Sequence, residues 1–179
     1  YYSDEIDCSP ELILQSMEYA LPHMSEELAQ AFDYMLEYGL YDIDYSPAKM
    51  NVGFTCDLLY YNEPFIFNCA NDTFYDYTSM YHEFGHFVNS FYTESDLLFG
   101  AGDFDLAELQ SQGMQVLMTQ FFPEIFGQEN GDIITVFLSD VNQEVRPGSI
   151  LQNVKIGAHE GKQDAKKIFY TLDEYQIAA

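Results

Sequence analysis

The chain has 179 residues, 47% of them hydrophobic, which is enough apolar material for the core of one domain and excludes intrinsic disorder. Its 30 acidic residues against 6 basic ones give a formal net charge of −24. This charge excludes nucleic acids and anionic membranes as partners, because binding to either requires Lys and Arg. No apolar run reaches the roughly 20 residues that span a bilayer.

Turn and capping signals predict helices with a short strand region between them. Ser9-Pro10 and Ser25 are typical helix starts, and Asn71-Asp72-Thr73 caps a long helix. Residues 42–69 are rich in β-branched and aromatic side chains. The predicted elements are helices at about 10–21, 25–39, 73–92, 104–120 and 131–144, and strands at about 50–56 and 65–69. The predicted fold class is mostly α with a small β-sheet.

The basic residues are concentrated at the end of the chain. Residues 1–145 hold one base, Lys49, against 26 acids, whereas residues 146–179 hold five bases and four acids. The segment Arg146-Pro147-Gly148-Ser149 is typical of a turn or linker. We therefore predict one domain over 1–145, followed by a linker and a C-terminal segment of unclear assignment over 146–179.

The three cysteines, Cys8, Cys56 and Cys69, are too few for a disulfide framework, and their odd number leaves at least one thiol free. A free thiol favours a reducing compartment, so we expect a cytoplasmic location. The chain begins Tyr-Tyr-Ser-Asp, with neither Met nor a basic leader, and we expect it to be a piece of a longer protein.

Residues 82–86 read His-Glu-Phe-Gly-His and fall within a predicted helix. Positions i and i+4 of a helix lie about 40° apart around its axis, so His82 and His86 project side by side and can share one metal ion. Glu83 lies about 100° round and can reach a water on that metal without ligating it. This is the HExxH arrangement of zinc peptidases, in which a coordination position stays open for water. The alternative is a buried polar pair satisfied by hydrogen bonds.

A zinc site needs a third protein ligand. The other two histidines, His23 and His159, do not follow the motif at the spacing of metzincins. Glu108 is the better candidate, because two antiparallel helices joined by a loop would bring it opposite the histidine pair. Asp96 and Asp103 stay open as alternatives.

Asp105 and Ser111 lie one helical turn to either side of Glu108 and share its face. Either could orient a metal ligand, as metal-bound imidazoles usually require. The alternative for both residues is helix capping and solvation.

The aromatic strand region has two interpretations. An exposed edge strand there could pair with the backbone of a bound peptide. Phe54, Phe65 and Phe67 could instead fill the core beneath the helix that carries the histidines, and we favour the core for these three. Tyr60 and Tyr61 fit either interpretation, because each has an apolar ring and a polar tip.

Several motifs, in this order along the chain, resemble the oligoendopeptidase F and thimet oligopeptidase family of zinc peptidases, over roughly residues 10–145. The residues that carry the resemblance are Gly39-Leu40-Tyr41-Asp42, Pro64-Phe65-Ile66-Phe67-Asn68, Asp72-Thr73, His82-Glu83-Phe84-Gly85-His86, Asp105-Leu106-Ala107-Glu108 and Ser111-Gln112.

The resemblance implies a zincin-like catalytic core, in which the HExxH helix packs against a second helix that carries the glutamate ligand. It implies one Zn²⁺ per chain bound by His82, His86 and Glu108, with Glu83 as general base. It also implies hydrolysis of peptide bonds in short peptides.

The chain departs from this family in length. Family members are several times longer, with helical lobes around a channel, and carry downstream Tyr and His residues that stabilise the reaction intermediate. The segment after residue 146 does not match that region, so no motif assigns the role to Tyr170 or Tyr175. We therefore keep a second hypothesis, a non-catalytic zinc- or peptide-binding remnant that needs complementary parts of a longer parent chain. Retention of Glu83 argues against it, because a structural site needs no general base.

Overall fold

The computed structural model of the chain describes residues 7–93 and 104–127, and for residues 104–107 it describes the backbone alone. The predicted helix at 131–144 and the predicted boundary near residue 146 lie outside the described residues. The same holds for Asp96, Asp103, His159, Tyr170 and Tyr175.

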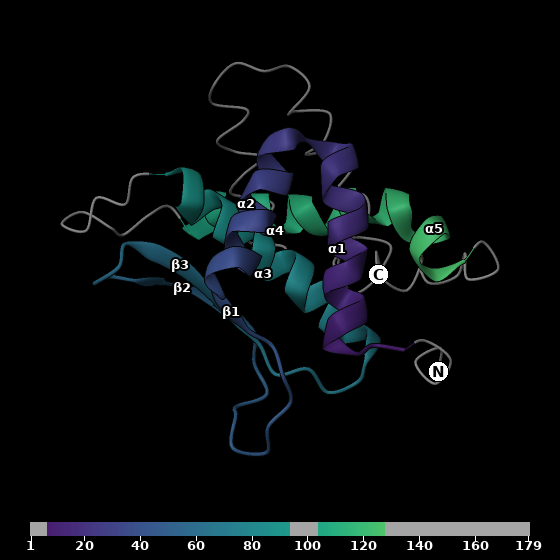
Figure 1. Cartoon of the computed structure of the whole chain (residues 1–179), viewed down its shortest axis with the longest axis horizontal. Coiled ribbons are helices and arrows are strands. Elements are labelled where there is room, and N and C mark those ends of the chain that lie inside the picture. The colour runs from purple at the N-terminus through teal and green to yellow at the C-terminus, as the bar shows by residue number, and fades with distance from the viewer. Residues whose placement is uncertain (1–6, 94–103, 128–179) are drawn as a thin grey trace, which may run out of the picture.

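The described part is mostly helical with one small sheet, which confirms the predicted fold class (Figure 1). In chain order the elements are α1 (Pro10–Met24), α2 (Glu26–Tyr38), β1 (Tyr41–Asp42), β2 (Phe54–Leu58), β3 (Glu63–Phe67), α3 (Phe74–Tyr92), α4 (Phe104–Met118), the 3₁₀ turn η1 (Thr119–Phe121) and α5 (Phe122–Phe126).

Helices α1 and α2 form a hairpin joined at Ser25. The Ser25 side chain accepts a hydrogen bond from the Leu28 N–H at 3.1 Å, which caps α2 as predicted. The Ser25 N–H donates to the Leu21 carbonyl at 3.1 Å and closes α1. The predicted end of α1 near residue 21 was too early: the helix includes Pro22 in its last turn and continues to Met24.

The sheet has the order β1-β3-β2, with β1 parallel and β2 antiparallel to β3. Phe54 pairs with Phe67, and the strands lie a few residues from their predicted bounds. Pro64 is tolerated within β3 because β1 reaches only Ile66 and Phe67, so the missing N–H removes no bond to β1.

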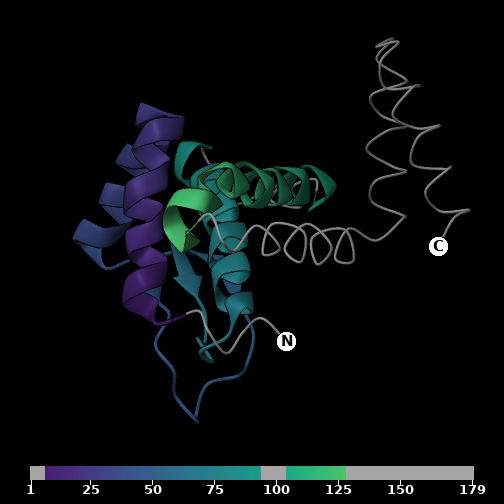
Figure 2. The same ribbon diagram turned by 90° about the vertical axis from the view of Figure 1, so that its right-hand side faces the viewer.

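Helix α3 is the central element. Its start, predicted at residue 73, is confirmed within one residue: the buried Asp76 carboxylate accepts hydrogen bonds from the N–H groups of Thr73 at 2.8 Å and Asn71 at 2.9 Å. The helix contacts β2, β3, α1, α2 and α4. Figure 2 shows α1 and α2 side by side, with α4 running across α3.

The core lies where α1, α2, α4, α5 and the sheet meet α3. Its largest fully buried side chains are Tyr81, Phe32, Phe84, Phe87, Phe122, Ile13, Met17, Leu21, Met35, Ile66 and Met80. The prediction that Phe54 belongs to the core was wrong. Its side chain is 43% exposed and stacks on Phe67 with the ring centroids 4.9 Å apart, because β2 lies at the sheet edge.

The end of α4 differs from the prediction of a helix reaching residue 120. The helix ends at Met118, and Pro123 stands in the first turn of α5 instead of only breaking the chain. Proline is favoured there because an N–H in the first turn has no partner within the helix.

Cys8 and Cys69 are buried, whereas Cys56 is exposed. The cytoplasmic location stays a prediction from this thiol chemistry. Each helix within residues 7–93 and 104–127 is too short or too polar to cross a bilayer.

Candidate metal centre

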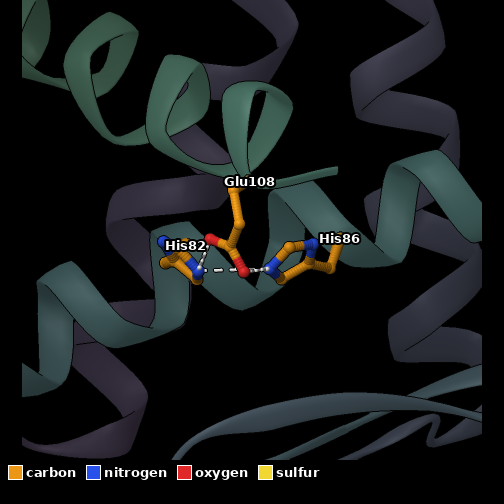
Figure 3. Close-up of side chains that lie close together, drawn as sticks. All are labelled: His82, His86 and Glu108. Atoms are coloured by element: carbon orange, nitrogen blue, oxygen red, sulfur yellow. Dashed lines mark hydrogen bonds and ion pairs between the residues drawn. The ribbon is translucent and has the colours of Figure 1, made fainter. Parts of the chain in front are cut away.

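Three side chains from two helices converge beside the sheet. His82 and His86 project from one face of α3, and their Nε2 atoms lie 3.1 Å apart (Figure 3). Glu108 reaches them from α4, with its Oε2 3.3 Å from the His82 Nε2 and its Oε1 3.6 Å from the His86 Nε2. The structure thus brings together the three residues predicted as ligands, and within the described residues they form a group that could hold a metal ion.

The spacing of these atoms fits a tetrahedral zinc site. Zinc binds imidazole nitrogen and carboxylate oxygen at about 2.0–2.2 Å, so tetrahedral geometry separates neighbouring ligand atoms by about 3.3–3.5 Å. The two imidazole nitrogens, 3.1 Å apart, lie close to this range, and each is 3.3 or 3.6 Å from a different oxygen of Glu108. With one atom from each residue, the three ligand atoms lie within 4.8 Å of one another. Two imidazole nitrogens and one carboxylate are also a donor set that suits zinc.

The imidazole of His86 is suited to ligation by its surroundings. Burial lowers the pKa of His86, and neighbouring His82 lowers it further, while Glu108 opposes the shift. A lowered pKa keeps this imidazole neutral at neutral pH, so that its Nε2 lone pair is available to a cation.

Gln115 fixes the orientation of His82 and was missed in the sequence. Its Oε1 lies 3.1 Å from the His82 Nδ1, and its Nε2 donates to the Thr78 carbonyl at 3.2 Å. Because the Gln115 Nε2 donates to Thr78, the Gln115 oxygen faces His82. The Nδ1 of His82 therefore carries the proton, and the Nε2 of His82 is left free to ligate. The sequence signal that could have identified Gln115 is its position seven residues after Glu108, which places both residues on one face of a helix.

Ser111, one of the two residues predicted to orient a ligand, lies next to Glu108. Its fully buried hydroxyl lies 3.0 Å from the Glu108 carbonyl oxygen and 3.4 Å from its Oε2. The shorter contact indicates that the hydroxyl mainly bonds the preceding turn of α4, with the carboxylate within reach. The other predicted residue, Asp105, has a side chain outside the described part of the structure.

Glu83 lies in the same cavity as the metal ligands. The cavity has a volume of about 480 Å³ and is lined by β2, α3 and Glu108. The Glu83 side chain is only 7% exposed, and its Oε2 lies 2.9 Å from the Thr55 hydroxyl. Burial raises the pKa of Glu83, while His82 and the Thr55 hydroxyl oppose the shift.

Strand β2 forms one wall of this cavity, with residues 53–57 in its lining. Gly53 makes the close approach possible, because a Cβ at this position would lie 2.4 Å from the Ser79 Oγ on α3. In the described residues β2 pairs with β3 on one side only, so its other edge keeps free backbone groups. The edge strand considered from the sequence therefore exists, and it borders the metal centre.

The fold is similar to that of solved peptidase structures. Pz peptidase A with a bound inhibitor matches 82% of this chain with a TM-score of 0.68 at 21% identity. Two proteins assigned as oligoendopeptidase F, the second from Bacillus anthracis, each match 93% of it, with TM-scores of 0.68 and 0.61 at 20% and 16% identity.

The matches cover only 26%, 30% and 32% of those three proteins, so the chain spans about a quarter to a third of their length. No protein-family model matches the chain, and no curated protein matches it. At this level of identity the likeness is one of fold, and the described part of the chain has the fold of a segment of these peptidases.

Proposed function

We propose that the chain carries the catalytic centre of a zinc metalloendopeptidase that hydrolyses short peptides, with one Zn²⁺ bound by His82, His86 and Glu108. The observation that carries this proposal is the convergence of three ligand atoms within 4.8 Å of one another, in a cavity that also contains Glu83. The fold likeness to peptidases supports the reaction class.

Zinc at this site would supply a Lewis acid that lowers the pKa of water towards about 7 and polarises a peptide carbonyl. Glu83 acts as general base: it accepts a proton from the attacking water and delivers it to the leaving amine. Burial supports this role, because a carboxylate with a raised pKa is a stronger base and holds the accepted proton more tightly until the proton passes to the leaving amine. The Thr55 hydroxyl holds the carboxylate in place.

The free edge of β2 supports binding of an extended peptide. Backbone N–H and C=O groups of residues 53–57 can pair with a substrate strand, which brings a peptide bond beside the histidine pair. Such main-chain pairing is independent of side-chain identity and suits an enzyme for short peptides of varied sequence. The negative charge of the chain favours basic peptides to a small degree.

A second candidate is a non-catalytic zinc- or peptide-binding unit that needs complementary parts of a longer parent chain. The share of the matched structures that the chain spans, about a quarter to a third, favours this candidate. Lost contacts to the substrate would weaken its positioning, and one lost oxyanion donor typically costs about 10²–10³ in rate.

Zinc analysis combined with a quenched fluorogenic peptide assay tests both candidates. The peptidase predicts one zinc per chain, hydrolysis by the wild type, and loss of hydrolysis with retained zinc in Glu83→Gln. Glu37→Gln on α2 is the matched control, because Glu37 lies outside the metal cavity. If the chain binds zinc but hydrolyses peptides only when it is joined to a longer relative, the second candidate is favoured. Absence of zinc binding would refute the peptidase and would restrict the second candidate to a peptide-binding unit.

A further inference from the structure

A second cavity lies between the end of α2 and the β2–β3 hairpin. Its volume is about 420 Å³, and it shares no lining residue with the metal cavity. We call it the aromatic pocket, because its lining includes Tyr34, Tyr38, Tyr61 and Phe65, together with Leu58 and the carboxylate-bearing Glu63.

Two rings of the aromatic pocket are in contact, and two are open to solvent. Tyr34 and Tyr38, one helical turn apart on α2, have ring centroids 4.4 Å apart. Tyr38 is 59% exposed and Tyr61 is 70% exposed, so a ligand can reach both rings from outside. Aromatic faces carry partial negative charge, and several of them around one space attract a cation.

A carboxylate adds a full negative charge to this lining. The Tyr34 hydroxyl donates to the Glu63 Oε1 at 2.7 Å. This bond, with burial and the charge of Glu63, raises the pKa of Tyr34 to about 12, which keeps the phenol protonated as a donor. The bond occupies one oxygen of Glu63 and leaves the second for another donor.

The described residues contain no cation to neutralise Glu63. Lys49 is the one Lys or Arg within residues 7–93 and 104–127, and it forms its ion pair with Asp42. A carboxylate that lines the same pocket as four aromatic rings, and that has no Lys or Arg partner in the part of the chain that the structure describes, is complementary to a cationic ligand.

The aromatic and acidic lining of the pocket favours arginine over lysine. A guanidinium group is planar, stacks on aromatic rings and donates several hydrogen bonds in one plane, whereas an ammonium is a compact, strongly hydrated charge. We propose that the aromatic pocket binds the guanidinium group of an arginine side chain presented by a peptide of another chain. This inference is independent of the proposed peptidase activity.

Nuclear magnetic resonance of the full ¹⁵N-labelled chain tests the proposal, with Nα-acetyl-L-arginine N-methylamide as probe and its citrulline counterpart as neutral control. The arginine compound should produce saturable amide shifts concentrated in residues 34–40 and 58–65. The citrulline compound, of nearly the same shape without the charge, should bind at least about fivefold more weakly. Shifts spread over the acidic surface, or equal binding of both compounds, would overturn the proposal.

Variants separate the pocket from general attraction to an acidic protein. Glu63→Gln keeps an acceptor for Tyr34 and removes the charge, and Tyr38→Leu removes one exposed ring; each should weaken binding about fivefold. The matched controls are Tyr45→Leu, whose 64% exposed side chain lies outside the lining, and Glu11→Gln on α1. Equal weakening by variants and controls would show non-specific binding and refute the site.

Discussion

Gly85, inside the His-Glu-Phe-Gly-His motif, lies against the backbone of Ser111 on the neighbouring helix. A Cβ built at Gly85 would stand 2.5 Å from the Ser111 Cα, well inside contact distance. The absence of a side chain at Gly85 therefore lets α4 approach α3 closely. Because Ser111 is one turn from Glu108, the same contact sets how far the glutamate stands from the two histidines.

Gly85→Ala should consequently destabilise the fold by about 1–3 kcal/mol, the usual cost of overpacking a well-filled interface. The clash is with backbone, so α4 has to shift, and zinc affinity should fall together with stability. Chemical denaturation and zinc competition with a chromophoric chelator measure the two effects.

The matched control is Gly113→Ala on α4, where an added Cβ would meet no atom within 4 Å. Alanine is favoured over glycine within helices, so this variant should gain about 0.5–1 kcal/mol and keep its zinc affinity. If Gly85→Ala proved as stable as Gly113→Ala, the close approach of the two helices would not be a requirement of the fold.

Glu108→Ala should weaken zinc binding by more than the roughly 10–100-fold typical of an outer-shell substitution, because it removes a direct ligand. The same chelator competition measures this loss. Glu124→Ala on α5 is the control, since Glu124 lies outside the metal cavity and should leave the affinity unchanged. Wild-type zinc affinity in Glu108→Ala would move the third ligand to Asp96 or Asp103.

The sequence predicted the helices and the histidine pair because their signals are local. A capping residue and an i,i+4 spacing act within one helix, so His82 and His86 share a face of α3 whatever surrounds them. The sequence identified Glu108 as a candidate ligand but did not predict its position in space, because that position depends on how α4 crosses α3.

The parts that the sequence did not predict depend on contacts between elements. The strand bounds shifted because pairing of β2 with β3 is set by the hairpin, and Phe54 became exposed because β2 is an edge strand. Gln115 was missed for the same reason. Its spacing from Glu108 indicated a shared helix face, but only the packing of α4 on α3 brings its amide to His82.

Gln115→Leu should weaken zinc binding about 10–100-fold, since His82 loses the acceptor that fixes its protonated nitrogen. It should also destabilise the fold by about 1–3 kcal/mol, because the Thr78 carbonyl loses its buried donor. Gln120→Leu, at an exposed position beyond α4, is the control for the side-chain exchange.

Gln115→Glu separates the two roles of this amide. A carboxylate still accepts from the His82 Nδ1 but cannot donate to Thr78, so zinc affinity should be retained while stability falls. A purely structural role for Gln115 would instead leave zinc affinity unchanged in the leucine variant after correction for unfolding.

The start of α3 predicts a distinct dependence of stability on pH. Burial raises the pKa of Asp76 above its usual value, although the N–H groups of Thr73 and Asn71 oppose the shift. A carboxyl whose folded pKa exceeds its unfolded pKa binds a proton more tightly when folded, so it costs stability once it is ionised. This cost is fully present above the folded pKa and is relieved as the pH falls through the folded pKa towards the unfolded value of 3.8.

Asp76→Asn cannot ionise, yet its amide oxygen can accept from both N–H groups that contact the Asp76 Oδ2. The free energy of unfolding of the wild type should therefore rise relative to that of Asp76→Asn as the pH is lowered from 7 towards 4, in parallel denaturation curves. A difference between the two proteins that stays constant over this range would mean that Asp76 has its ordinary pKa, and a difference of opposite sign would mean that the two N–H donors outweigh its burial.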